Sequence, residues 1–159
     1  NRNGSKKLIN KILEVMALSN ENELILDYCA SKLSSYSIEL LIKEGVNFCL
    51  YNARWQIAEL IGRNKDEGWE KYLLELVNDE NKYVQRRALI ALNRINTNLG
   101  EKIAFQKFKD DDYMLRFVSL RLLHKMSSDL VDKALLILEN DPSNVVRKEI
   151  SKIKHNNKN

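Results

Sequence analysis

The chain has few of the residues that break helices, cross-link a fold or anchor it in a membrane. Only one proline and five glycines occur in 159 residues, which disfavours a turn-rich β fold and favours helices. No apolar run reaches the roughly 18–20 residues of a membrane helix, and residues 1–7 show no signal peptide. Two cysteines offer neither a disulfide framework nor a zinc spacing. We therefore expect an all-α protein without membrane contact, located in the cytoplasm.

The sequence does contain an internal repeat with a period of 31 residues. Two polar series share this step: Arg54, Gln85, Arg116 and Arg147 form the first, and Asp79, Asp110 and Asp141 form the second. Each of these aspartates stands six residues before a member of the first series. The apolar residues Leu74, Phe105 and Leu136 keep the same step. Because three series share one period, the chain consists of equivalent repeats.

Each repeat is predicted to contain two helices joined by a polar turn. Residues 69–77 and 84–95 show apolar positions at helical spacing, and the polar stretch 78–81 separates them. In the last repeat, Pro142 takes a first-turn position, where its missing N–H is not needed. The repeats are predicted at approximately 5–34, 35–65, 66–96, 97–127 and 128–155. The first is degenerate, with helices near 6–17 and 22–32. We expect about ten helices in five pairs, forming one domain over residues 1–159.

These repeats resemble the HEAT-like repeat family, particularly its short bacterial form. In that form, an aspartate and a short turn precede a Val-Arg-x-x-Ala-Ala-x-x-Leu stretch. Asp110 followed by Leu115-Arg116, and Asp141 followed by Val146-Arg147, fit this motif. Three positions depart from it: Phe48 replaces the aspartate, and Gln85 and Glu23 replace the arginine. The resemblance implies a right-handed α-solenoid in which neighbouring helix pairs share one core.

The resemblance also implies a structural role for the charged residues of the motif. In this family, the motif arginine and aspartate pair between adjacent repeats as a ladder. The matching residues here are Arg54, Asp79, Asp110, Arg116, Asp141 and Arg147. Because they recur in successive repeats, we do not interpret them as a catalytic acid–base set.

Basic residues gather on the second helix of each repeat. Residues 53–63, 84–94, 115–125 and 146–155 hold 12 Lys/Arg against two glutamates, a net charge of +10, whereas the rest of the chain carries −6. In the family these helices line the concave face. Two columns are expected to point outward from it: Leu24, Trp55, Arg86, Phe117 and Lys148, and then Tyr28, Glu59, Ile90, Arg121 and Lys152. The predicted binding residues are Trp55, Arg86, Arg87, Phe117, Arg121, Lys148 and Lys152.

This basic, aromatic-containing face favours a monomeric, non-enzymatic binding module or scaffold for an acidic protein partner. Trp, Phe and Arg are typical interface anchors, and small bacterial proteins of this family can act as adaptors or immunity-type proteins. The same residues suit phosphates and stacked bases, so a nucleic-acid binding protein is the alternative. That alternative includes a relative of the HEAT-like alkylpurine DNA glycosylases, since Trp55 and Glu59 lie one helical turn apart. A net charge of only +4 favours the protein partner.

No other residues predict a catalytic, metal or cofactor site. His124 and His155 also stand 31 residues apart, but no third ligand joins them, and we expect both at the surface. Cys29 and Cys49 fall on apolar stripes and are predicted to lie in the core. The run Asp110–Asp112 lacks the alternating ligands of a calcium loop. HEAT-like phycobilin lyases share the repeat, but no pigment site is visible. We therefore predict no cofactor.

Overall fold

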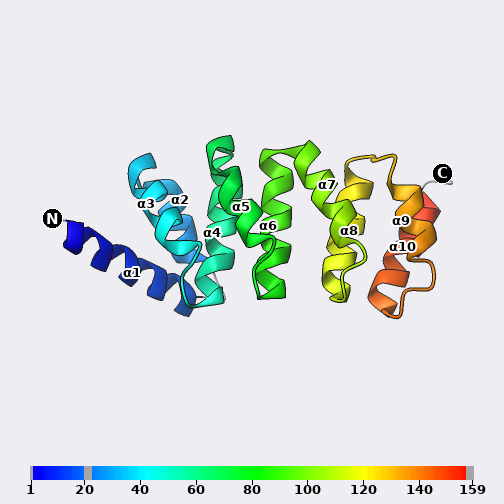
Figure 1. The fold of residues 1–159 in the computed structure, drawn as a ribbon, viewed down its shortest axis with the longest axis horizontal. Coiled ribbons are helices and arrows are strands. Elements are labelled where there is room, and N and C mark those ends of the chain that lie inside the picture. Colours follow the sequence, from blue (N-terminus) through cyan, green and yellow to red (C-terminus); the bar gives the residue numbers. More distant parts are fainter. Residues whose placement is uncertain (1, 20–22, 157–159) are drawn as a thin grey trace. The chain divides into compact units, whose positions relative to one another are not determined.

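The computed structural model describes residues 2–19 and 23–156, with side chains from residue 6 onward. Over these residues it contains ten α-helices, one short 3₁₀ helix and no strand (Figure 1). The all-α prediction is thus confirmed. Every helix in this part of the chain falls short of the length and apolar character required to cross a membrane. The chain divides into two compact units, an N-terminal unit (1–95) and a C-terminal unit (96–159).

The N-terminal unit contains the first six helices. Their bounds are α1 Arg2–Leu18, α2 Leu24–Lys32, α3 Ser35–Gly45, α4 Tyr51–Asn64, α5 Glu70–Leu76 and α6 Lys82–Ile95, with the 3₁₀ helix η1 at Glu67–Trp69 before α5. The helices predicted near 6–17 and 22–32 correspond to α1 and α2. The boundary between the two compact units, at residues 95 and 96, lies within a residue of a predicted repeat boundary.

The C-terminal unit contains four helices in two pairs. Their bounds are α7 Thr97–Lys107, α8 Tyr113–Lys125, α9 Val131–Ile137 and α10 Asn144–Asn156. Helix α8 packs against α7, α9 and α10. It therefore holds the centre of this unit, and its fully buried residues Leu115, Leu120 and Leu123 form part of the core.

The repeated aspartates build the same turn between the helices of a pair. The side chain of Asp79 accepts a hydrogen bond from the backbone N–H of Asn81 at 2.7 Å. Asp110 accepts one from Asp112 at 2.9 Å, and Asp141 accepts one from Ser143 at 2.8 Å. Such aspartate turns satisfy a backbone donor locally and stop the preceding helix. Part of the 31-residue period therefore arises because the same aspartate turn recurs in each of these repeats.

Helix α4 is the central element of the N-terminal unit. It packs against α1, α2, α3, α5 and α6, and all ten residues 53–62 are buried. Gly62 permits a close approach to α6, because a Cβ placed there would lie 2.8 Å from the Cβ of Ala91. A helix covered on all sides has no outward-facing column, and this changes the interpretation of the side chains that α4 carries.

Candidate functional site

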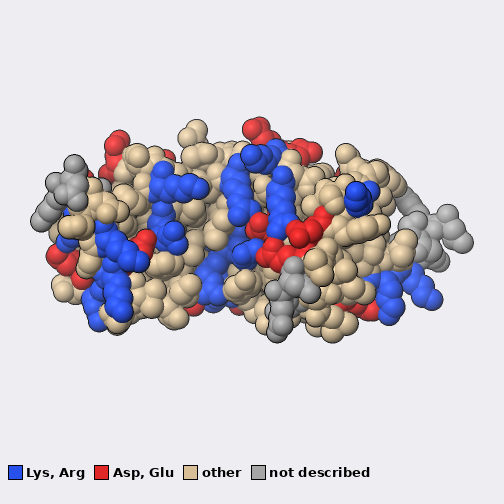
Figure 2. All heavy atoms as spheres, turned by 180° about the vertical axis from the view of Figure 1, so that it is seen from behind, with Lys and Arg blue, Asp and Glu red and all other residues tan. Residues whose placement is uncertain are grey.

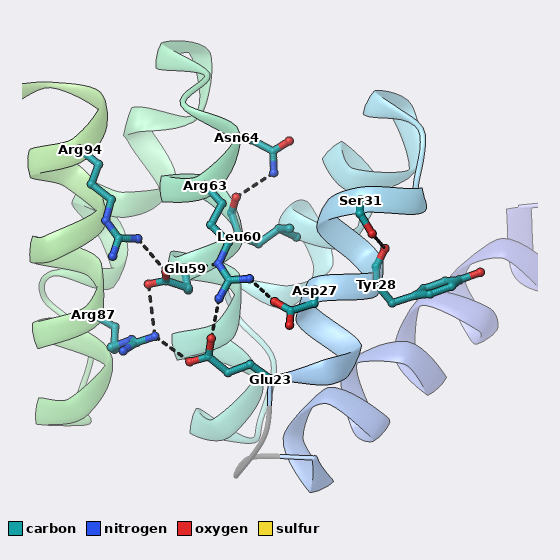
Figure 3. A network of polar contacts seen from close by, with 10 residues as sticks. All are labelled: Glu23, Asp27, Tyr28, Ser31, Glu59, Leu60, Arg63, Asn64, Arg87 and Arg94. Carbon is teal, nitrogen blue, oxygen red and sulfur yellow. Dashed lines mark hydrogen bonds and ion pairs between the residues drawn. The ribbon is translucent and has the colours of Figure 1, made fainter.

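A network of charged side chains joins α2, α4 and α6 in the N-terminal unit (Figure 3). At its centre lies the carboxylate of Glu59, whose side chain is only 7% exposed. Its Oε1 accepts hydrogen bonds from Arg94 at 2.7 Å and from Arg63 at 3.3 Å. Its Oε2 lies 3.2 Å from a guanidinium nitrogen of Arg87. Three arginines from two helices therefore surround one buried carboxylate.

The surrounding charges keep Glu59 ionised. Burial by itself raises the pKa of this carboxyl group, but the hydrogen bonds from Arg94 and Arg63 and the charges of Arg87 and Arg94 together lower the pKa by more. The pKa of Glu59 consequently lies below the ordinary value for a glutamate. With its oxygens held by guanidinium groups, Glu59 acts as the anionic centre of a salt-bridge network.

Two further carboxylates contact the same arginines, one on the residue before α2 and one in its first turn. Glu23 lies 2.5 Å from Nη2 of Arg63 and 3.1 Å from Nη2 of Arg87. Asp27 lies 2.5 Å from Nη1 of Arg63. These two acids were not among the predicted site residues. The signal was nevertheless present, because Glu23 places an acid where the repeat expects an arginine.

The structure contradicts the prediction that Trp55 is an exposed anchor. Its indole is 2% exposed and makes an edge-to-face contact with Tyr83, with ring centroids 5.6 Å apart. The guanidinium of Arg87 lies 4.8 Å from the centre of the indole ring. Trp55 is therefore a core residue of α4 and does not present a face on which a base could stack. Glu59, expected to point outward one turn later, is buried for the same reason.

The predicted basic residues on α6 lie in different environments. Arg87 forms salt bridges with Glu23 and Glu59, so its positive charge is largely neutralised within the N-terminal unit. Arg86 is partly exposed, and its guanidinium lies 5.1 Å from the ring centre of Tyr83. Figure 2 shows Lys and Arg gathered over α4 and α6, with a patch of Asp and Glu beside them. The structure thus places Glu23 and Asp27, which were not among the predicted binding residues, beside the arginines of this unit.

In the C-terminal unit, the predicted binding residues form an exposed cluster on α8 and α10. The guanidinium of Arg121 lies 5.5 Å from the ring centre of the half-buried Phe117. Glu149 lies 3.5 Å from Arg121 and 3.8 Å from Lys152, whose side chains are 62% and 73% exposed. Lys148 is also exposed, one helical turn before Lys152. The ion pairs of Arg121 and Lys152 with Glu149 are long, so much of the positive charge faces solvent. We call Phe117, Arg121, Lys148 and Lys152 the C-terminal cluster.

Two of the motif arginines, Arg54 and Arg116, bind aspartates 25 residues further along the chain. Arg54 donates from Nε and Nη2 to the two carboxylate oxygens of Asp79, at 2.7 and 2.9 Å. Arg116 contacts Asp141 in the same bidentate way, at 2.7 and 2.8 Å. All four side chains of these pairs are at most 10% exposed. Each pair lies within one compact unit and joins two successive repeats there.

A second contact of the motif position explains why Gln85 can replace arginine. Arg54, Arg116 and Arg147 each donate from Nη1 to the backbone carbonyl six residues earlier. Gln85 makes the same contact through Nε2, to the carbonyl of Asp79 at 2.6 Å. This bond needs only a donor and a backbone acceptor. The repeat therefore tolerates both Gln85 and the replacement of the aspartate by Phe48.

The remaining candidate residues form no site. His124 is half-buried and His155 exposed, and no group of three or more His, Cys, Asp or Glu in the described residues could hold a metal ion. Cys29 is buried as predicted, whereas Cys49 is exposed. The prediction for Cys49 was wrong because the residue falls in the turn before α4. No family model matches the chain, and no curated protein is significantly similar to it.

The Arg116–Asp141 pair predicts a stability that depends on pH. Burial by itself raises the pKa of Asp141. The hydrogen bonds from Arg116 and from the N–H of Ser143 lower the pKa by a larger amount, so it lies below the ordinary value for an aspartate. Because the pKa of Asp141 is lower in the folded than in the unfolded protein, the ionised carboxylate stabilises the fold at any pH above the unfolded-state pKa of about 3.9. This stabilisation is lost as the pH falls through the folded-state pKa. Between pH 6 and pH 3, wild type should lose more unfolding free energy in urea than Asp141→Asn. The exposed Asp129→Asn serves as the control and should track wild type; equal losses in all three proteins would contradict the assignment.

Proposed function

We propose that the protein is a HEAT-like helical repeat protein, built as a right-handed solenoid, that acts as a non-enzymatic binding module for an acidic protein partner. The observation that carries the proposal is the C-terminal cluster. There the guanidinium of Arg121 lies over the ring of Phe117 on α8, and Lys148 and Lys152 expose positive charge on the neighbouring helix α10. An aromatic ring with adjacent cations is a common anchor in protein interfaces, and Figure 2 shows Lys and Arg gathered over α8 and α10.

Acidic residues among the cations favour a protein partner over a nucleic acid. Glu149 lies between Arg121 and Lys152 in the C-terminal cluster, and Glu23 and Asp27 accompany the arginines of the N-terminal unit. These carboxylates would repel a continuous phosphate backbone, whereas a peptide presents its charges singly. The buried Trp55 also removes the feature on which the resemblance to a DNA glycosylase rested.

Charge reversal in the C-terminal cluster tests the proposal. Arg121→Glu with Lys148→Glu should weaken binding of a glutamate-rich peptide about tenfold or more, chiefly through slower association, because exposed charges steer encounter. Helicity and melting temperature should stay close to wild type, since both side chains are exposed. Binding is measured by titration at two salt concentrations, with a duplex DNA of equal charge as the competing ligand.

The matched control reverses two lysines of the same unit that lie outside the cluster, Lys102→Glu with Lys109→Glu. This variant has the same net charge and should bind the peptide nearly as wild type does. Equal weakening by both double variants would show a bulk charge effect and contradict the proposal. Tighter binding of the DNA, with a steep dependence on salt, would favour the nucleic-acid alternative.

A further inference from the structure

The arginines of the N-terminal unit already hold two carboxylates in the manner of a ligand. Glu23, the residue before α2, and Asp27, in the first turn of α2, contact adjacent guanidinium groups of α4 and α6 (Figure 3). Their side chains are 34% and 58% exposed. These salt bridges are intramolecular, but they lie at the surface of the unit.

Helix α2 packs on α1 and α4 through few buried side chains. Leu26 and Cys29 are its only buried residues, whereas Leu24 and Tyr28 are 63% and 61% exposed. An apolar groove of about 260 Å³, lined in part by Tyr28, lies along α1 and α2. The residue that precedes the helix, Glu23, has a positive φ of 50° and makes no capping hydrogen bond with its side chain. A short helix with so few buried side chains is expected to open at a low free-energy cost.

The arginines would remain in place without α2. Arg63, Arg87 and Arg94 have side-chain exposures of 29%, 24% and 41%, and the buried Glu59 holds all three from below. Glu59 carries one negative charge against three positive ones. Removal of Glu23 and Asp27 would thus leave a preorganised surface with two excess positive charges, oriented for carboxylates.

We propose that Arg63, Arg87 and Arg94 form a binding surface for an acidic helix of a partner protein, and that Glu23 and Asp27 occupy this surface in the free protein as a built-in competitor. The fitting ligand is a helix with one carboxylate in its first turn and a second on the residue that precedes the helix, because Asp27 and Glu23 hold these two positions at α2. The inference rests on the proposed function only in that both assign an acidic protein partner. It concerns a different surface, in the other compact unit.

The test removes the competing charges without changing the size of the side chains. Glu23→Gln with Asp27→Asn should bind a designed helical peptide, with Asp in its first turn and Glu on the residue before the helix, about tenfold more tightly than wild type does, because the arginines are no longer occupied by these two carboxylates. A tenfold change corresponds to roughly 1.4 kcal/mol. A peptide with Gln and Asn at these positions should show no gain. The control variant is Glu39→Gln with Glu44→Gln, which removes two carboxylates of α3 that pair with Lys43 and Lys6 and should gain little.

The gain should persist when Arg121→Glu and Lys148→Glu are also present, which separates this inference from the proposed function. An equal gain in the α3 control, an equal gain for duplex DNA, or no gain in a folded variant would each overturn the inference. If the variant does not fold, hydrogen exchange on wild type decides the question. Saturating acidic peptide should accelerate exchange of the α2 amides at 26–32, and unchanged or slower exchange there would overturn the proposal.

Discussion

Replacement of Arg116 by alanine is expected to lower the free energy of unfolding by about 3–5 kcal/mol, the usual effect of removing one partner of a buried ion pair. Arg116 makes two hydrogen bonds to Asp141 and two to backbone carbonyls in the turn before α8. Its loss leaves the carboxylate of Asp141, which is 2% exposed, without its charge partner. Urea denaturation of the full chain, followed by circular dichroism, measures the change.

A double variant separates the charge effect from the loss of packing. Arg116→Met with Asp141→Asn removes both charges and keeps most of the side-chain volume, so it should be more stable than Arg116→Ala. Binding of the acidic peptide to folded Arg116→Ala should remain close to wild type. An Arg116→Ala protein of full stability that had lost binding would instead place this residue in the binding surface.

Truncation of Leu92 should destabilise the N-terminal unit by about 2–5 kcal/mol, because a cavity replaces a fully buried side chain. Leu92 is 0% exposed on α6, and α6 packs against α4 and α5. Close packing of α6 against Gly62 of α4 limits how far the helices can move to fill the space. The melting temperature and the urea midpoint of Leu92→Ala should both decrease.

The matched control is Leu18→Ala at the end of α1, where the side chain is 83% exposed. It makes the same chemical change without creating a cavity and should alter the stability by less than about 0.5 kcal/mol. Similar melting temperatures for Leu92→Ala and Leu18→Ala would mean that the apolar phase assigned to the second helices is wrong.

The helices and their turns could be predicted because they depend on neighbours in the sequence. Asp79, Asp110 and Asp141 each bind a backbone N–H two residues ahead, so a local pattern was enough to locate the turns. The bounds predicted for the helices at 22–32, 69–77 and 84–95 also lie within two residues of those of α2, α5 and α6 in the structure. Such short-range preferences are visible in a single sequence.

The environment of α4 could not be predicted because it depends on helices distant in the sequence. The repeat pattern assigned the same outward position to Trp55 and Phe117, yet Trp55 is buried and Phe117 is only half-buried. The difference arises from the degenerate first repeat, whose helices α1 and α2 pack on α4. A periodic pattern does not describe how a repeat that deviates from it packs, so the contacts of Glu23 and Asp27 with the arginines of α4 and α6 could not be predicted.

Both tryptophans of the chain, Trp55 and Trp69, lie in the N-terminal unit, and residues 96–159 have none. Indole fluorescence therefore reports the unfolding of one unit, whereas far-ultraviolet dichroism sums the helices of both. Coincident transitions from the two signals would indicate a single cooperative system, and separate transitions would give each unit its own stability. Leu92→Ala should shift the fluorescence transition directly. Any shift of that transition by Arg116→Ala would measure the energetic coupling between the units.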